Sequence, residues 1–97
     1  MPKAYWVTNY REISDPEKLA AYAKLATIAT APFGSRYLAR GMPASAYEAG
    51  LMERLVITEY PSLAKAVAAY ESPGYQEALK ALGNAAVRDI RFVEGTE

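Results

Sequence analysis

Two strand-like segments of this chain carry apolar side chains on both of their alternating sides. Segment 54–60 has Val56 and Tyr60 on one side, with Leu55 and Ile57 on the other. Segment 4–10 repeats this arrangement, with Trp6 and Tyr10 on one side and Tyr5 and Val7 on the other. Because side chains alternate along a strand, both faces of the resulting sheet need a cover. So short a chain supplies helices for one face only, so we expect a second copy of the sheet to cover the other.

Length and composition limit the classes of function. For 97 residues we expect a single domain, 1–97, whose own core is modest. Basic and acidic residues number eleven each, so the chain lacks the basic field that binds nucleic acid. It contains neither cysteine nor histidine, which excludes disulfides, thiol chemistry, and the commonest metal ligand and general base. We therefore expect no metal and no cofactor.

The hydropathy of the chain and its first residues indicate the cellular compartment in which we expect it. No apolar run approaches the roughly 18 residues that a membrane helix needs. Residues 1–5 lead straight into a strand, without a charged leader, an apolar core and a cleavage site. These patterns predict a cytoplasmic protein that does not bind membranes.

The first half of the chain predicts a strand, a helix and a second strand. The strand covers residues 3–13, and the helix begins either with Asp15 as cap before Pro16 or with a Ser14–Glu17 capping box. The helix runs for about four turns to Pro32, and its apolar stripe consists of Leu19, Tyr22, Ala23 and Ala26. Leu25 and Ile28 lie outside this stripe and would face a second neighbour. Residues 35–40 form the second strand.

The second half repeats the order after an irregular excursion at 42–53. A strand at 54–60 is followed by a helix that Ser62 caps, with a stripe of Leu63, Ala66, Val67 and Tyr70. The helical pattern restarts at Ser72 and Pro73 and ends at Gly83, before a strand at 88–94. The order βαββαβ predicts a ferredoxin-like α+β fold, with a four-stranded antiparallel sheet and helices on one face. The bare face predicts a homodimer.

Four segments carry a family resemblance: 33–41, 54–62, 70–76 and 93–95. In this order they resemble the domain-of-unknown-function family 1330 (DUF1330), and the similarity spans nearly the whole chain. That family is similar to the dimeric α+β barrels, which include cofactor-free monooxygenases, small isomerases and haem enzymes. The resemblance implies the fold and the dimer. The chain departs from the family pattern at Ser35, at Ala49 after Glu48, and at Leu82.

Arg40, Glu59 and Tyr75 match family motif positions. Arg40 is a candidate catalytic residue, because its planar donors suit a carboxylate or enolate oxygen, and the alternative is an ion pair with Glu59 or Glu48. Glu59 shares its side of the strand with apolar residues, which makes it a candidate general base or the partner of an arginine. Glu48, in the excursion, is a candidate for substrate binding.

Three further side chains are candidates for substrate binding. The amide of Asn9 suits a ligand carbonyl, or it bonds a neighbouring side chain. Tyr37 and Tyr75, with Trp6, suit the lining of a cavity for a planar molecule, although aromatic residues also fill cores.

Two functions follow, from different classes. One is a small-molecule-binding protein, a cofactor-free enzyme acting on a small carbonyl or carboxylate metabolite through Arg40 and Glu59 with Asn9 or Tyr75. The other is a non-catalytic dimeric binding or scaffold module whose polar groups satisfy one another, which a filled core would favour. A third option, implied by the relatives, is haem held by a tyrosine.

Overall fold

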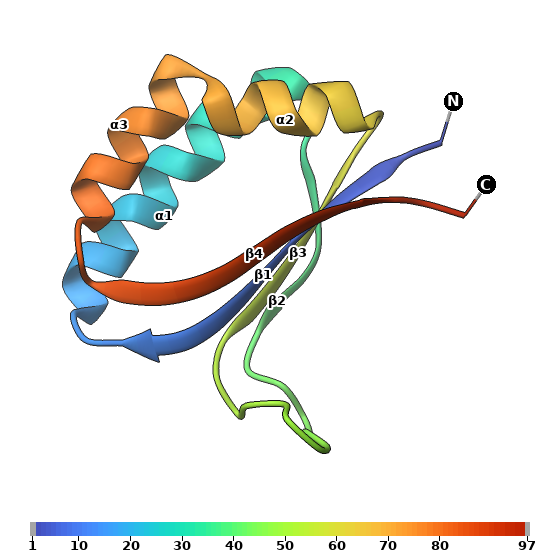
Figure 1. The fold of residues 1–97 in the computed structure, drawn as a ribbon. Coiled ribbons are helices and arrows are strands. Elements are labelled where there is room, and N and C mark those ends of the chain that lie inside the picture. Colours follow the sequence, from blue (N-terminus) through green and yellow to red (C-terminus); the bar gives the residue numbers. More distant parts are fainter. Residues whose placement is uncertain (1, 97) are drawn as a thin grey trace.

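The computed structural model describes residues 2–96, so positions 1 and 97 of the expected domain lie outside the described residues. The elements follow the predicted order, with the second helix in two parts (Figure 1). They are β1 (Ala4–Ile13), α1 (Pro16–Thr30), the short 3-10 helix η1 (Ala31–Phe33), β2 (Arg36–Gly41), β3 (Leu55–Tyr60), α2 (Leu63–Glu71), α3 (Pro73–Leu82) and β4 (Ala86–Glu94). The ferredoxin-like α+β prediction is confirmed.

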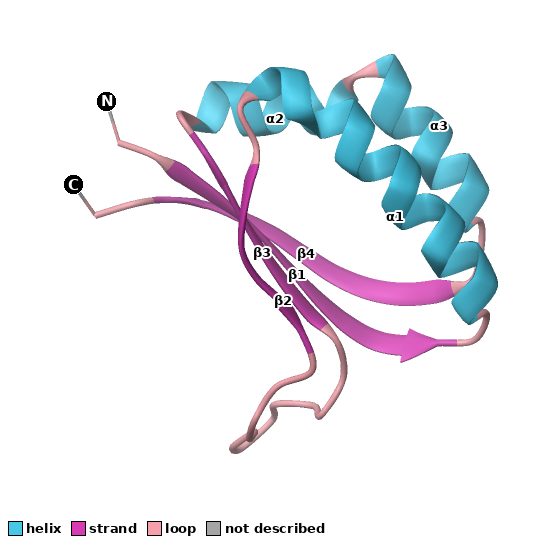
Figure 2. Ribbon diagram, turned by 180° about the vertical axis from the view of Figure 1, so that it is seen from behind, coloured by secondary structure: helices cyan, strands magenta, loops and turns pink. Residues whose placement is uncertain are grey.

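The four strands form one antiparallel sheet in the order β2-β3-β1-β4. The three α-helices lie on the same side of this curved sheet, and no helix of residues 2–96 lies against its other side (Figure 2). None of the helices within residues 2–96 has the length and apolar character of a membrane span.

The structure decides which side of each strand faces the helices. In β1 the buried residues are Ala4, Trp6, Thr8 and Tyr10, while the residues between them are half-buried. Cross-strand partners share a face, so this side of the sheet continues through Thr58 and Tyr60 of β3 and Arg88 and Phe92 of β4. We call this side the helix face. The open face carries Tyr5, Val7, Asn9, Leu55, Ile57, Glu59, Val87, Asp89, Arg91 and Val93.

The helix starts follow the predicted capping residues, while α1 ends at Thr30, two residues before Pro32, which lies in η1. The Asp15 carboxylate accepts hydrogen bonds from the backbone N–H groups of Glu17 and Lys18, each at 3.1 Å. Asp15 is therefore the cap, and the Ser14 hydroxyl instead donates to the carbonyl of Ala85 at 3.1 Å. Ser72 caps α3 by accepting from the N–H of Tyr75, so the two helical parts meet at a strong helix start.

One position of the predicted helical stripe is wrong. Ala66 and Ala69 form the buried side of α2, whereas Val67 is 38% exposed. Each residue turns a helix by about 100°, and Val67 lies that far from Ala66 on the side away from Ala69. Leu25 and Ile28 of α1 are exposed, as expected for residues outside the α1 stripe.

The core centres on Trp6. Its ring centroid lies 5.0 Å from that of Phe92, 5.0 Å from that of Tyr75 and 5.5 Å from that of Tyr70. Much of the remaining core consists of alanines on α1, α2 and α3. Small helix residues against large aromatic rings leave space unfilled between α1 and the strands β1 and β3, and the site lies there.

Candidate functional site

A cavity of about 280 Å³ lies between α1 and the helix face of the sheet. Such a volume is near the lower end of the range for small-molecule sites. Its lining is aromatic and apolar with hydroxyl groups and two arginines: Trp6, Thr8, Tyr10, Pro16, Leu19, Ala20, Tyr22, Ala23, Ala26, Thr30, Tyr37, Arg40, Arg54, Val56, Thr58, Tyr60 and Tyr75. Among these lining residues there is no carboxylate.

A register shift in β2 brings Tyr37 and Arg40 to the same cavity. Tyr37 lies opposite Thr58 and Arg40 opposite Val56, with the irregularity between Tyr37 and Ala39. Without the shift these two positions would face opposite sides of the sheet, because their spacing is odd. The guanidinium carbon of Arg40 lies 4.3 Å from the centroid of the Tyr37 ring, a cation–π contact.

Tyr37 is itself held by α1. Its hydroxyl lies 2.9 Å from the hydroxyl of Thr27, and either can donate. Arg40 is exposed and Arg54 is half-buried, so these two cations mark the part of the cavity that reaches solvent.

Two buried tyrosines and an arginine form a second polar group at the cavity. The hydroxyl oxygens of Tyr22, from α1, and Tyr75, from α3, lie 2.7 Å apart. Arg88 of β4 donates a hydrogen bond from Nη1 to the Tyr22 hydroxyl at 2.9 Å, and its guanidinium carbon lies 4.8 Å from the centroid of the Tyr22 ring. Arg88 forms no ion pair within residues 2–96.

Burial raises the pKa of Tyr22, Tyr60 and Tyr75, which we call the buried tyrosines. For Tyr22 the charge of Arg88 opposes this effect without reversing it, and for Tyr75 the neighbouring Tyr22 adds to it. A phenol loses its proton only at about pH 10 even in water, so the buried tyrosines are neutral at pH 7. They act as hydrogen-bond donors and acceptors rather than as bases.

The structure divides the six candidate site residues into two groups. Tyr37, Arg40 and Tyr75 line the cavity. The other three lie elsewhere: Asn9 and Glu59 on the open face, and Glu48 in the exposed excursion, where its φ is +53°.

The expected ion pair of Arg40 with Glu59 or Glu48 does not occur among the described residues. Glu59 instead lies 3.7 Å from Nζ of Lys3, and Arg40 lies over Tyr37. The reason is that Arg40 and Glu59 occupy opposite faces of the sheet, with Arg36 as the cross-strand partner of Glu59.

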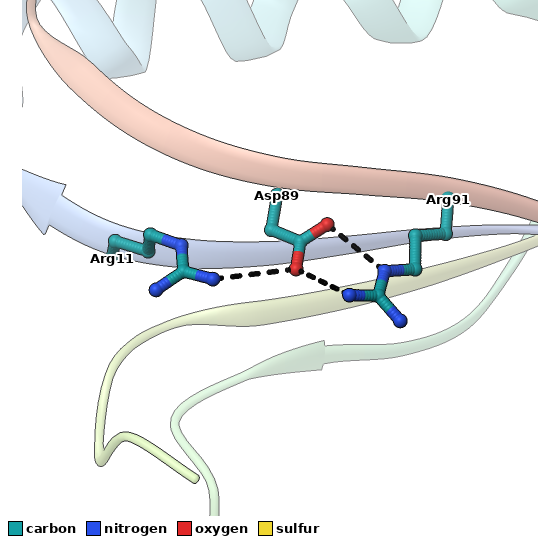
Figure 3. Close-up of polar contacts among 3 residues, drawn as sticks. All are labelled: Arg11, Asp89 and Arg91. Atoms are coloured by element: carbon teal, nitrogen blue, oxygen red, sulfur yellow. Dashed lines mark hydrogen bonds and ion pairs between the residues drawn. The ribbon is translucent and has the colours of Figure 1, made fainter. Parts of the chain in front are cut away.

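The open face carries its own polar cluster, formed by Arg11, Asp89 and Arg91 (Figure 3). One carboxylate oxygen of Asp89 lies 3.6 Å from Nη2 of Arg11, and the other accepts a hydrogen bond from Nε of Arg91 at 3.2 Å. These side chains point away from the helices, so they are separate from the cavity.

Sequence reasoning missed Tyr22, Arg54 and Arg88 as site residues. The sequence pattern places Tyr22 in the apolar stripe of a helix and Arg88 at the start of a strand. The available signal was the pairing of neighbouring strands, because Arg88 lies opposite Tyr10 and therefore on the helix face. That register follows from contacts far apart in the chain.

Comparison with known proteins gives a family and a set of similar folds. The model of the family "Domain of unknown function (DUF1330)" matches residues 3–96. No curated protein matches the sequence.

Three solved structures illustrate the similarity of fold. A protein of unknown function from Rhodopseudomonas palustris is 23% identical, with a TM-score of 0.71 over 99% of this chain and 82% of that chain. SnoaB, a cofactor-independent oxygenase from Streptomyces nogalater, is 10% identical, with a TM-score of 0.66 over 100% and 96%. A dimeric ferredoxin-like protein of unknown function from Thermobifida fusca is 14% identical, with a TM-score of 0.65 over 97% and 92%.

Proposed function

We propose, from the premise that this chain belongs to the DUF1330 family of unknown function, that it binds a small planar carboxylate that also bears a carbonyl group. The site is the cavity between α1 and the sheet. The main support for this proposal is the positive charge of the cavity lining. Arg40 and Arg54 line the cavity, no carboxylate lines it, and neither arginine forms an ion pair within residues 2–96.

An anionic ligand suits these cations. A guanidinium binds a carboxylate through two parallel hydrogen bonds, and such bonds are stronger than those between neutral groups. The aromatic lining favours a planar body, and the hydroxyl groups of the buried tyrosines suit a carbonyl oxygen. The unfilled volume also favours a ligand site over a module with a filled core.

The chemistry that the cavity supports is stabilisation of an anion. Its lining offers no carboxylate, so the chain itself brings no such base to a ligand there. The substrate would be one that readily loses a proton next to a carbonyl to solvent water, with its negative charge then stabilised by arginine and tyrosine donors. Glu59 has no part in this proposal because it lies on the open face. The oxygenase activity of SnoaB, without a cofactor, is compatible with such chemistry on this fold.

We further propose that two copies of the chain associate through their open faces. Val87 and Val93 are 52% and 54% exposed there, and the same face carries the half-buried Val7, Leu55 and Ile57. Burial of such apolar surface in an interface would stabilise a dimer. The similar T. fusca protein is a dimer. The cavity of each subunit would then lie on the helix face of its sheet, away from the partner subunit.

Ligand binding can be measured through Trp6, the one tryptophan of the chain, because it lines the cavity. The probes are benzoylformate, a planar keto carboxylate, and acetophenone, which lacks the carboxylate. We expect Arg40→Ala and Arg54→Ala each to weaken benzoylformate binding about tenfold and to leave acetophenone binding unchanged.

The matched control is Lys24→Ala, which removes one positive charge from an exposed position of α1 outside the cavity lining. Its benzoylformate affinity should equal that of the original protein. A cavity that binds neither probe, or binds benzoylformate equally well after both arginine substitutions, would refute the proposed ligand class.

A further inference from the structure

We propose that the hydroxyl groups of Tyr22 and Tyr75 form an oxyanion site in the cavity and that Arg88 is the residue that positions them. This inference rests on the proposed function and extends it to the reacting oxygen of the ligand. The ligand class is a carbonyl compound whose oxygen gains negative charge, such as an enolate, or a phenolate. Arg40 and Arg54 bind the carboxylate, and the two tyrosines bind this second oxygen.

The hydrogen-bonding capacity of the pair supports the site. Two phenol hydroxyl groups carry two hydrogens, and one of these lies in the 2.7 Å bond between Tyr22 and Tyr75. Within residues 2–96 neither hydroxyl has a further side-chain acceptor. Whichever tyrosine donates, one phenol hydrogen is left over, and both residues line the cavity. A ligand oxygen can accept that hydrogen.

Arg88 determines how the pair is polarised. Its Nη1 donates to the Tyr22 hydroxyl at 2.9 Å, so the Tyr22 oxygen accepts a charge-assisted hydrogen bond. This bond makes the hydrogen of Tyr22 a better donor, either to Tyr75 or directly to a ligand. The positive charge behind the pair also stabilises a negative charge that develops in front of it.

The surroundings of Arg88 fix its position. It lies opposite Tyr10 in the sheet, and its guanidinium carbon is 4.8 Å from the ring centroid of Tyr22 and 5.8 Å from that of Tyr10. Its side chain thus has aromatic contacts and a phenol acceptor where a structural arginine usually has a carboxylate. The absence of a carboxylate keeps the positive charge available to the hydroxyl pair.

The experiment uses 4-nitrophenol, because its phenol and phenolate forms absorb at different wavelengths. An oxyanion site binds the phenolate more tightly than the phenol, so the bound probe ionises at lower pH than the free probe. We expect Tyr22→Phe and Tyr75→Phe each to reduce the ratio of phenolate to phenol affinity about tenfold. Arg88→Leu should reduce it similarly, and Arg88→Lys should restore part of it.

The control is Tyr70→Phe, the same chemical change beside Tyr75 but outside the cavity lining, with ring centroids 5.1 Å apart. It should leave the ratio unchanged. A folded protein that binds benzoylformate and 4-nitrophenol, but shows the same ratio in all these variants, would overturn the oxyanion site alone. Failure to bind either probe would overturn the proposed function as well. The two phenylalanine substitutions keep the ring, so the test does not depend on folding of the Arg88 variants.

Discussion

The hydrogen-bonded hydroxyl groups of Tyr22 and Tyr75 predict that Tyr22→Phe and Tyr75→Phe lower the free energy of unfolding by different amounts. Tyr75→Phe removes one bond between neutral groups, and Tyr22 keeps its bond to Arg88. Net hydrogen bonds of that kind contribute about 1 kcal/mol to stability. Tyr22→Phe removes the shared oxygen, so the guanidinium of Arg88 loses its acceptor and Tyr75 loses its partner. A hydrogen bond to a charged group contributes about 1.5 to 3 kcal/mol, so the total for Tyr22→Phe is about 3 kcal/mol.

The double variant tests the same network more sharply. Once the Tyr22 hydroxyl is gone, removing that of Tyr75 breaks no further bond, so the second substitution should cost close to nothing. The two substitutions should therefore be non-additive by about 1 kcal/mol. Urea unfolding of all four proteins at one fixed protein concentration measures these free energies, and a fixed concentration is needed because association adds to stability.

Two results would refute this reasoning. One is a Tyr75→Phe variant at least as destabilised as Tyr22→Phe. The other is full additivity, which would mean that the two hydroxyl groups do not share a bond in solution. Tyr70→Phe again serves as control, because no hydrogen bond of its hydroxyl is present among the described residues, and it should change stability by less than about 0.5 kcal/mol.

Three further predictions concern backbone, pH and association. Gly83→Ala places a Cβ at φ +55° and ψ −126°, where residues with a Cβ are strained, and Gly34→Ala places one at φ +83° and 2.9 Å from a proline carbon. Each should cost about 1 kcal/mol or more in thermal unfolding, and a variant as stable as the original protein would contradict the geometry. Burial raises the pKa of all three buried tyrosines, so the folded state keeps protons that the unfolded state loses above about pH 10. This stability is complete below that pH and falls as the pH rises above it, by about 1.4 kcal/mol per pH unit for each tyrosine that is still protonated in the folded state, so Tyr60→Phe should reduce the slope by about that amount in urea titrations. Ile57→Asp on the open face should shift the protein from dimer to monomer in sedimentation, while Ala68→Asp on the exposed side of α2 should not; a monomeric original protein would contradict the association.

Much of the fold follows from local patterns in the sequence. Pro16 and Pro73 each stand at the first turn of a helix, after Asp15 and Ser72 as caps, and these signals act over a few residues. Local patterns do not show which side of each strand faces the helices. Tyr5 and Trp6 are both aromatic, so their alternation alone leaves open which one meets the helices, and only the packing of the alanine-rich helices against Trp6 decides it.

The site was less predictable because its geometry depends on long-range contacts. Tyr37 and Arg40 share the cavity only through the irregularity in β2, and no glycine or proline at positions 37–39 marks it. Arg88 and Tyr22 are 66 residues apart in sequence, and a hydrogen bond joins their side chains. The family motifs include Arg40 and Tyr75, which line the cavity, and also Glu59, which lies on the other face of the sheet.

The distribution of ion pairs over the two faces extends the argument for an anionic ligand. On the open face, Asp89 lies against Arg11 and Arg91, and Glu59 lies against Lys3. On the cavity side, Arg40, Arg54 and Arg88 have no acidic partner within residues 2–96.

Leaving a half-buried cation unpaired is unfavourable, and the chain has as many acidic as basic residues with which to neutralise it. The exposed Lys18, Lys24, Lys65 and Arg36 also form no ion pair within residues 2–96, but water solvates them at little cost. Arg54 and Arg88 are the half-buried arginines without an ion pair, and a ligand in the cavity can supply the missing negative charge. The two substitutions Arg40→Ala and Arg54→Ala should therefore stabilise the empty protein or leave its stability unchanged while they weaken benzoylformate binding. Loss of stability from both would assign these arginines to the fold instead.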